Sequence, residues 1–137
     1  MQKRFLFLLM LLVCNSYGMV DSDASTIIKN REGWFYANVI GNSMKQYYPA
    51  ESTTVIVKPI DFSLLRLGQV IVYTNKFGEE VIHVITEKVT DGFLVKGANN
   101  KNNDSTVLTK DNFIGIVYVT FNDKSNSSRN LLACKEK

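Results

Sequence analysis

Histidine, cysteine and proline are scarce in this 137-residue chain, which contains one histidine, two cysteines and two prolines. One histidine and two cysteines cannot supply a closed set of soft ligands, so we expect no structural metal. Cys14 directly follows an apolar run near the N-terminus. If this N-terminal segment is removed, Cys134 is the only remaining thiol, which excludes an internal disulfide bond.

A strong excess of one charge is also lacking. The formal net charge is +3, and Lys3 and Arg4 contribute two of the positive charges in an N-terminal segment that has no acidic residue. The rest of the chain is close to neutral, and its charges are scattered without a basic stripe or an acidic block. Nucleic acid is therefore not an expected partner.

The N-terminus has the pattern of an export signal. A basic start is followed by an unbroken apolar run from Phe5 to Val13 and by the small and polar residues 15–18. The run is short for a membrane-spanning helix, so residues 1–18 are predicted to be a signal peptide. Cleavage after Ala24, lipid attachment at Cys14 and retention as an anchor are alternatives. The chain is thus expected to be exported, either to the periplasm or cell exterior or to the outer face of the cytoplasmic membrane.

A chain of this length has room for one domain, and its pattern is mostly that of strands. From about Ile27, β-branched and aromatic residues alternate with polar ones between turn-forming residues, and Asp61–Leu67 offers one short helical turn. Short connections favour a small β-barrel or sandwich in residues 19–121. Residues 122–137, rich in Asn and Ser, are expected to be a flexible polar tail. The predicted strands are Trp34–Ile40, Thr53–Lys58, Gln69–Tyr73, Glu80–Lys88, Gly92–Lys96 and Phe113–Phe121.

Three residues are candidates for chemistry. Ser43 follows Gly41-Asn42 after the first predicted strand and is either a displayed nucleophile or an ordinary turn residue. His83 lies in the middle of an apolar strand, on the same face as Val81 and Ile85. It is either a base or a half-buried residue with one hydrogen bond. Asp104 lies in a polar loop and is either a turn residue or a partner of the histidine.

Taken together, these three residues indicate serine catalysis. A serine hydroxyl is a weak nucleophile until a base removes its proton, and histidine suits this task near neutral pH. A carboxylate then orients the imidazole and stabilises its charged form, and such triads occur in several chain orders. The sequence therefore predicts a Ser43–His83 pair assisted by Asp104.

Five segments give this prediction a family context. In chain order they are GNSM at 41–44, LLRLGQVIVY at 64–73, VIHV at 81–84, GANN at 97–100 and IGIV at 114–117. This succession resembles the type I signal peptidase family, and the similarity covers residues 38–121. His83 falls at the base position of the serine–histidine branch, which is archaeal and endoplasmic-reticulum-like. Counting from Gly97, the histidine's carboxylate partner in that branch falls on Asp104.

The resemblance implies a fold, a substrate class and further site residues. The fold is a small, partly open barrel of the signal peptidase/LexA-like type, and the activity is cofactor-free cleavage of leader peptides or similar extended preprotein segments. Small side chains are expected beside the scissile bond. Gly41 replaces a serine that helps to hold the oxyanion, which leaves the backbone N–H groups of Ser43 and Asn42 for that role. Met44 belongs to the peptide-binding site or to the packing beneath it.

Several departures from the family pattern keep another class of protein open. Ala98 and Gln69 stand where the family has aspartate, and four residues separate Met44 from Pro49. The alternative is a catalytically inactive exported β-domain that serves as a binding or assembly module. The related LexA-type repressors pair serine with lysine and carry a DNA-binding domain, for which this chain lacks the length. Lys88 is a rival base, but alternation along the strand places it opposite His83.

An apolar lip is a second feature with two interpretations. Phe62, Leu64 and Leu65 lie close together in the sequence between two predicted strands. They form either a lip that contacts a membrane surface or part of the core.

Overall fold

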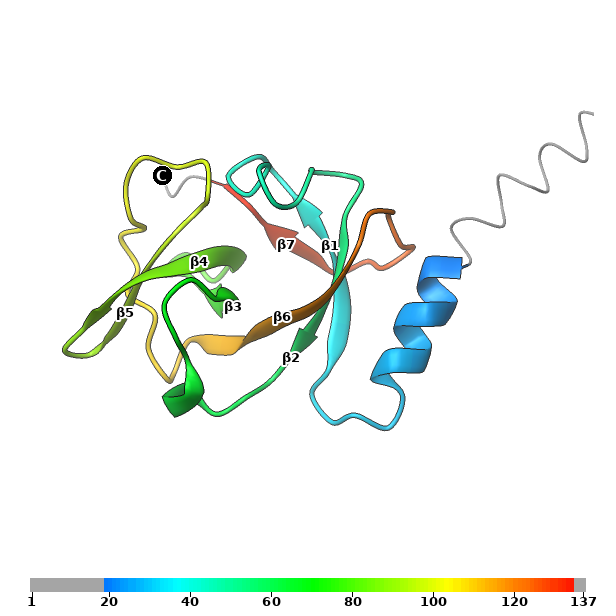
Figure 1. The fold of residues 1–137 in the computed structure, drawn as a ribbon, viewed down its shortest axis with the longest axis horizontal. Helices are drawn as coiled ribbons and strands as arrows, with labels where there is room; N and C mark the ends of the chain where they lie inside the picture. Colours follow the sequence, from blue (N-terminus) through cyan, green and yellow to red (C-terminus); the bar gives the residue numbers. More distant parts are fainter. Residues whose placement is uncertain (1–18, 135–137) are drawn as a thin grey trace, which may run out of the picture.

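The computed structural model describes residues 19–134, so the predicted signal peptide and residues 135–137 lie outside the described part. Residues 19–28 are helical, and seven strands follow (Figure 1). The prediction of a mostly β protein is confirmed, and six of the seven strands coincide with the predicted ranges to within one residue at either end. The strands are β1 (Phe35–Ile40), β2 (Thr54–Lys58), β3 (Val70–Thr74), β4 (Glu80–Val89), β5 (Gly92–Lys96), β6 (Phe113–Phe121) and β7 (Asn130–Leu132).

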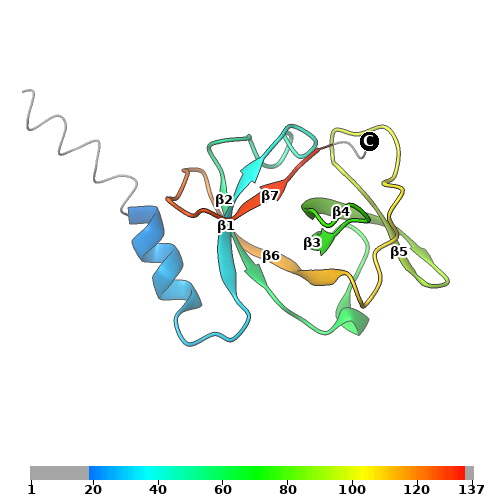
Figure 2. The ribbon, with the colours of Figure 1, turned by 180° about the vertical axis from the view of Figure 1, so that it is seen from behind.

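The strands form one sheet that closes on itself. Neighbouring strands pair in the order β3-β6-β2-β1-β7-β4-β5, and an additional β3–β4 pairing joins six of them into a ring. β4 is long enough to pair with β3 through its first half and with β5 through its second half. β7 joins β4 through one residue pair, Val81 with Leu132. The ring is therefore continuous but is held narrowly at this junction, which Figure 2 shows from behind.

Two apolar clusters lie on opposite faces of β3 and β4, because successive side chains of a strand point to opposite sides. The interior cluster draws residues from all six ring strands, and the outer cluster lies under β5 and the segment around Leu108. Members of the interior cluster include Ala37, Val39, Met44, Val55, Val57, Val72, Ile82, Leu131 and Ala133. Members of the outer cluster are Leu65, Ile71, Tyr73, Val81, Ile85, Phe93, Val95 and Leu108.

The prediction of a flexible tail from residue 122 is wrong for residues 122–134. Residues 130–132 form β7, which runs parallel to β1, and Leu131 and Ala133 are fully buried. The preceding polar residues are held by Asn38, whose side-chain amide donates to the backbone oxygens of Ser125 and Ser127 and accepts from the Ser125 hydroxyl group. Polar composition suggested disorder here because it does not reveal that a buried asparagine satisfies these groups.

The start of the predicted β domain is helical. Val20 and Ala24 are buried on this helix, and the Asp21 carboxylate accepts the backbone N–H of Asn126 at 3.1 Å. Figure 1 shows this helix at the end of the molecule opposite β5. Within residues 19–134, no helix is both long and apolar enough to cross a membrane.

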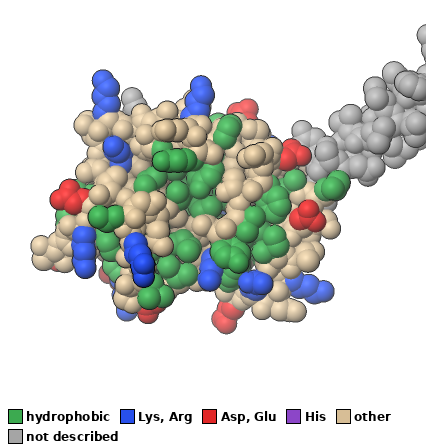
Figure 3. Space-filling model, in the orientation of Figure 1, with side chains coloured by type: hydrophobic (Ala, Val, Ile, Leu, Met, Phe, Trp, Pro, Cys, Tyr) green, Lys and Arg blue, Asp and Glu red, His purple; other side chains and the backbone are tan. Residues whose placement is uncertain are grey.

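The three residues of the apolar lip have different surroundings. Leu65 is buried and Phe62 packs against the rings of Phe93 and Phe113, so both belong to the core around the outer cluster. Leu64 remains 60% exposed on the short 3₁₀ helix η1 (Phe62–Leu64). On the face seen in Figure 3, hydrophobic side chains gather across the middle and Lys and Arg side chains are scattered around them.

Candidate active site

Ser43 is presented by a tight turn that follows β1. Gly41 has a φ angle of +87°, which favours glycine, and the turn is closed by hydrogen bonds from the backbone N–H groups of Lys45 to Asn42 O and of Tyr48 to Met44 O. The Ser43 carbonyl oxygen accepts the N–H of Asn99 at 2.7 Å. Tyr48 anchors the far side of the turn in the interior cluster, and this burial raises the pKa of its hydroxyl group. The nucleophile candidate is therefore held from both sides.

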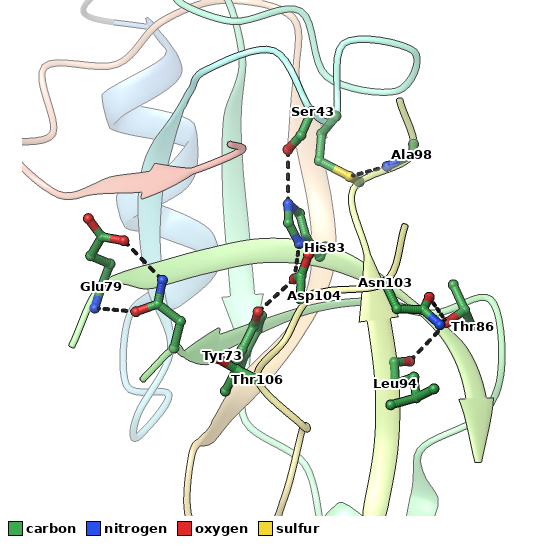
Figure 4. Close-up of polar contacts among 12 residues, drawn as sticks. Ser43, Tyr73, Glu79, His83, Thr86, Leu94, Ala98, Asn103, Asp104 and Thr106 are labelled. Atoms are coloured by element: carbon green, nitrogen blue, oxygen red, sulfur yellow. Dashed lines mark hydrogen bonds and ion pairs between the residues drawn. The ribbon is translucent and has the colours of Figure 1, made fainter. Parts of the chain in front are cut away.

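His83 reaches this turn from the middle of β4. The Ser43 Oγ and His83 Nε2 atoms are 2.9 Å apart, although the two residues are 40 positions apart in the chain (Figure 4). The His83 side chain is fully buried and lies on the same face as Val81 and Ile85, as the strand alternation predicted. The predicted contact between Ser43 and His83 is thus present in the folded chain.

Asp104 completes the line on the far side of the imidazole. One of its carboxylate oxygens, Oδ2, contacts His83 Nδ1 and also accepts a hydrogen bond from the Tyr73 hydroxyl group at 2.7 Å. The Asp104 backbone N–H donates to Val95 O, which fixes the loop against β5. A proton on Nδ1 donates to the carboxylate, and Nε2 is then the acceptor for the Ser43 hydroxyl proton. This tautomer is the one that a base next to a serine requires.

Tyr73 is a site residue that the sequence pattern did not single out. It lies in β3 on the same side as Ile71, and Ile71 pairs directly with His83. The signal in the sequence is a tyrosine in a strand that alternates with buried apolar residues, since a buried phenol needs a polar partner. Identifying that partner as Asp104 required knowledge of the strand pairing.

Gly97 also has a direct role that its place in the GANN segment did not reveal. A Cβ atom at this position would lie 2.6 Å from Ser43 Cβ and 2.8 Å from Ser43 Oγ. These distances are far below a normal contact, so the absence of a side chain at Gly97 makes room for the Ser43 hydroxyl group.

Met44 does not face a peptide. Its side chain is fully buried in the interior cluster, and its sulfur atom accepts the backbone N–H of Ala98 at 3.3 Å. The assignment of Met44 to the peptide-binding site is therefore corrected: the residue supports the Ser43 turn from below. Its long apolar side chain is part of the interior cluster, and the Ser43 turn covers this end of the cluster.

The two predicted oxyanion donors differ. The Ser43 N–H already donates to the carbonyl oxygen of Ala133 at 2.9 Å, so this donor is occupied by the chain itself. Asn42 is exposed, and within residues 19–134 its backbone N–H has no hydrogen-bond partner. The hydrogen bond between the Ser43 N–H and Ala133 could not be predicted from the sequence, because Ala133 lies in the segment that was predicted to be a flexible tail.

A cleft of about 600 Å³ opens at the Ser43 turn. It is lined by residues from the turn, the GANN loop and the segment after β7, namely Gly41, Asn42, Ser43, Lys45, Asn99, Asn100, Ala133 and Cys134. A second cavity of about 560 Å³ contains none of Ser43, His83 and Asp104, but Lys88 lines it. The pairing register of β4 shifts between Ile85 and Glu87, so simple alternation does not extend to Lys88. The residue is nevertheless exposed, and it is not among the residues that line the cleft.

The arrangement is suited to proton transfer from a serine hydroxyl group to an imidazole that a buried carboxylate orients. Among the residues that the structure describes, no three His, Cys, Asp or Glu side chains are grouped as metal ligands. Comparison with known protein families found no family model that matches the chain, and comparison with curated proteins found none that matches significantly.

Proposed function

We propose that the chain is an exported serine endopeptidase that acts through Ser43 and His83 with Asp104 as the orienting carboxylate. The observation that supports this most directly is the continuous line of contacts from the Ser43 hydroxyl group through both imidazole nitrogens to the Asp104 carboxylate. The line is buried along its length, as a preorganised catalytic group should be. The export assignment rests on residues 1–18 alone.

The proposed reaction is hydrolysis of a peptide bond in two steps. His83 Nε2 accepts the Ser43 proton while Oγ attacks the peptide carbonyl carbon, and the protonated imidazole then donates that proton to the leaving amine. Water, deprotonated by the same imidazole, hydrolyses the resulting acyl-enzyme ester. Asp104 stabilises the imidazolium ion in both steps. The Asn42 N–H is the donor left for the oxyanion, and the Ser43 N–H joins it once the peptide carbonyl oxygen replaces that of Ala133.

The substrate class follows from the resemblance to the serine–histidine branch of the type I signal peptidases. That resemblance implies extended leader peptides or preprotein segments with small side chains at the scissile bond. The ring of strands is compatible with such a fold, and an extended segment is the natural ligand of a sheet edge. Leu64 and the neighbouring exposed Leu67 are candidates for contact with a membrane surface near such substrates.

The test compares peptide cleavage by the wild type with cleavage by Ser43→Ala and His83→Ala. Each variant should lose turnover by about 10³-fold or more, because a serine without its base retains little nucleophilicity. Ser63→Ala is the matched control, because Ser63 is exposed and lines the second cavity, not the cleft at the Ser43 turn. Turnover retained in both active-site variants would refute the mechanism, provided that circular dichroism shows all the proteins to be folded.

One observation favours the alternative of an inactive binding or assembly module. Ser43 is only 5% exposed, and its backbone N–H is occupied by Ala133. A module of this kind would use the same cleft to hold a strand without cutting it. In the test above, a module of this kind would show no peptide cleavage in the wild type or in the variants.

A further inference from the structure

β7 lies between the strand that leads to the nucleophile and the strand that carries the base. Leu132 pairs with Ile40 of β1 on one side and with Val81 of β4 on the other, and both pairings are parallel. The three strands therefore advance in the same direction from this level. Along β1 the chain continues to Ser43, along β4 to His83, and along β7 to Ala133.

Ala133 directly follows β7, which lies between the strand that leads to Ser43 and the strand that carries His83. Its carbonyl oxygen accepts the Ser43 backbone N–H at 2.9 Å, and its own N–H donates to Ile40 O at 2.7 Å. A Cβ atom on Gly41 would lie 2.2 Å from the same carbonyl oxygen, so the glycine permits this close approach. The N–H of a nucleophilic serine is a donor that stabilises the oxyanion during acyl transfer. The Ala133 carbonyl oxygen accepts the hydrogen bond that the carbonyl oxygen of an acyl group under attack would accept.

We propose that residues 130–134 are an intramolecular substrate and that the chain cleaves its own Ala133–Cys134 bond. This inference rests on the proposed function of Ser43 and His83. Ser43 Oγ attacks the Ala133 carbonyl carbon while its proton passes to His83 Nε2. The C–N bond to Cys134 breaks, and the Cys134 amine takes that proton. Water then hydrolyses the Ala133 ester and leaves Ala133 with a free carboxylate.

The side chains of β7 show what the cleft accepts. The methyl group of Ala133 is fully buried in the interior cluster, so a small residue is expected at the acyl position. Leu131 points into the interior cluster, whereas Leu132 packs against the outer cluster. The site therefore selects a strand parallel to β1 that has a small residue at the cleaved bond and apolar residues before it.

The experiment follows the C-terminus of the full chain by peptide mapping and intact mass measurement. The wild type and Ser63→Ala should lose the residues from Cys134 onward, whereas Ser43→Ala should retain them. The rate constant should be the same at all protein concentrations, because the substrate is part of the same molecule. Each preparation is also given a synthetic peptide that copies residues 128–137, and its cleavage in trans is recorded.

The outcomes separate this inference from the proposed function. A wild type that stays intact yet cuts the peptide in trans would overturn self-cleavage and leave the endopeptidase standing. A wild type that cuts neither itself nor the peptide would overturn both. Loss of the C-terminal residues from Ser43→Ala at the wild-type rate would assign the cut to another protease and also overturn the inference.

Discussion

The Tyr73 hydroxyl group and His83 Nδ1 share one oxygen atom of Asp104, and all three side chains are buried. The carboxylate is therefore held by a neighbouring strand as well as by the imidazole. This makes Tyr73 a positioning residue: its hydroxyl group donates to Asp104, and it acts on the base through that carboxylate.

Tyr73→Phe removes this hydroxyl group without changing the shape of the core. We expect peptide cleavage to fall about tenfold or more, since a hydrogen bond to a charged group contributes about 1.5–3 kcal/mol. The fall should be in kcat with KM little changed, and the NMR signal of the His83 Nδ1 proton should shift.

Asp104→Asn should lower kcat by about 10²- to 10⁴-fold. In the double variant the effects should not add, because Tyr73 acts through Asp104; simple additivity would contradict its positioning role.

Gly97→Ala should disable the nucleophile by crowding it. Its Cβ atom would meet Ser43 Cβ at 2.6 Å, and a displacement of the hydroxyl group by about 1 Å is enough to lower cleavage about 10²-fold. Gly115→Ala is the control for crowding as such, because its Cβ atom would meet Lys58 O at 2.7 Å, far from Ser43 in the chain and outside the cleft lining. Both should lose stability in urea unfolding, but only Gly97→Ala should lose activity per folded molecule. Equal activities would show that Gly97 has no special relation to Ser43.

Gly41→Ala tests the docking of Ala133 against the Ser43 turn. A positive φ angle alone costs an alanine about 1–2 kcal/mol. Gly78→Ala measures that cost by itself, because Gly78 has a φ angle of +80° and a Cβ atom there would meet no other atom within 4 Å. Gly41→Ala should lose about 2 kcal/mol more than Gly78→Ala in urea unfolding, because its Cβ atom overlaps a backbone oxygen that no rotamer change can move. Equal losses would mean that β7 does not hold Ala133 against Gly41 in solution.

Leu131→Ala tests whether β7 belongs to the core. Leu131 is fully buried, so its truncation should cost about 2–5 kcal/mol of the free energy of unfolding. Leu67→Ala is the matched control, and at 58% exposure Leu67 should change stability by no more than about 0.5 kcal/mol. If the two variants are equally stable, residues 130–132 are the flexible tail that their composition suggested.

The strands that could be predicted are those in which local pattern and burial agree. In β3 and in residues 81–85 of β4, β-branched residues run between clear turns and both faces are largely covered, so these segments are mostly apolar. The face of His83 followed from alternation alone, because residues 81–85 precede the register shift. The pairing of Ser43 with His83 was predicted from chemistry, since no other histidine is present.

The features that could not be predicted depend on contacts between distant segments. β7 has three residues, too few for a periodic signal, and its place is fixed by parallel pairing with β1. In the helix at 19–28 half of the residues are polar, and only Val20 and Ala24 are buried. Tyr73 and Gly97 look like ordinary strand and loop residues until the fold brings them to Asp104 and Ser43. For the same reason the occupied Ser43 N–H could not be anticipated.

A single residue pair, Leu132 with Val81, closes the barrel between β7 and β4. Each residue pair in a long ladder is supported by the pairs on either side of it. A junction that consists of one pair lacks this support, so it opens at a smaller free energy than the rest of the sheet. Amide hydrogen exchange should therefore be quicker at residues 131–133 than in β2 or β6. The sheet would then open between β7 and β4, next to Ser43, while the pairing between β2 and β6 stays intact.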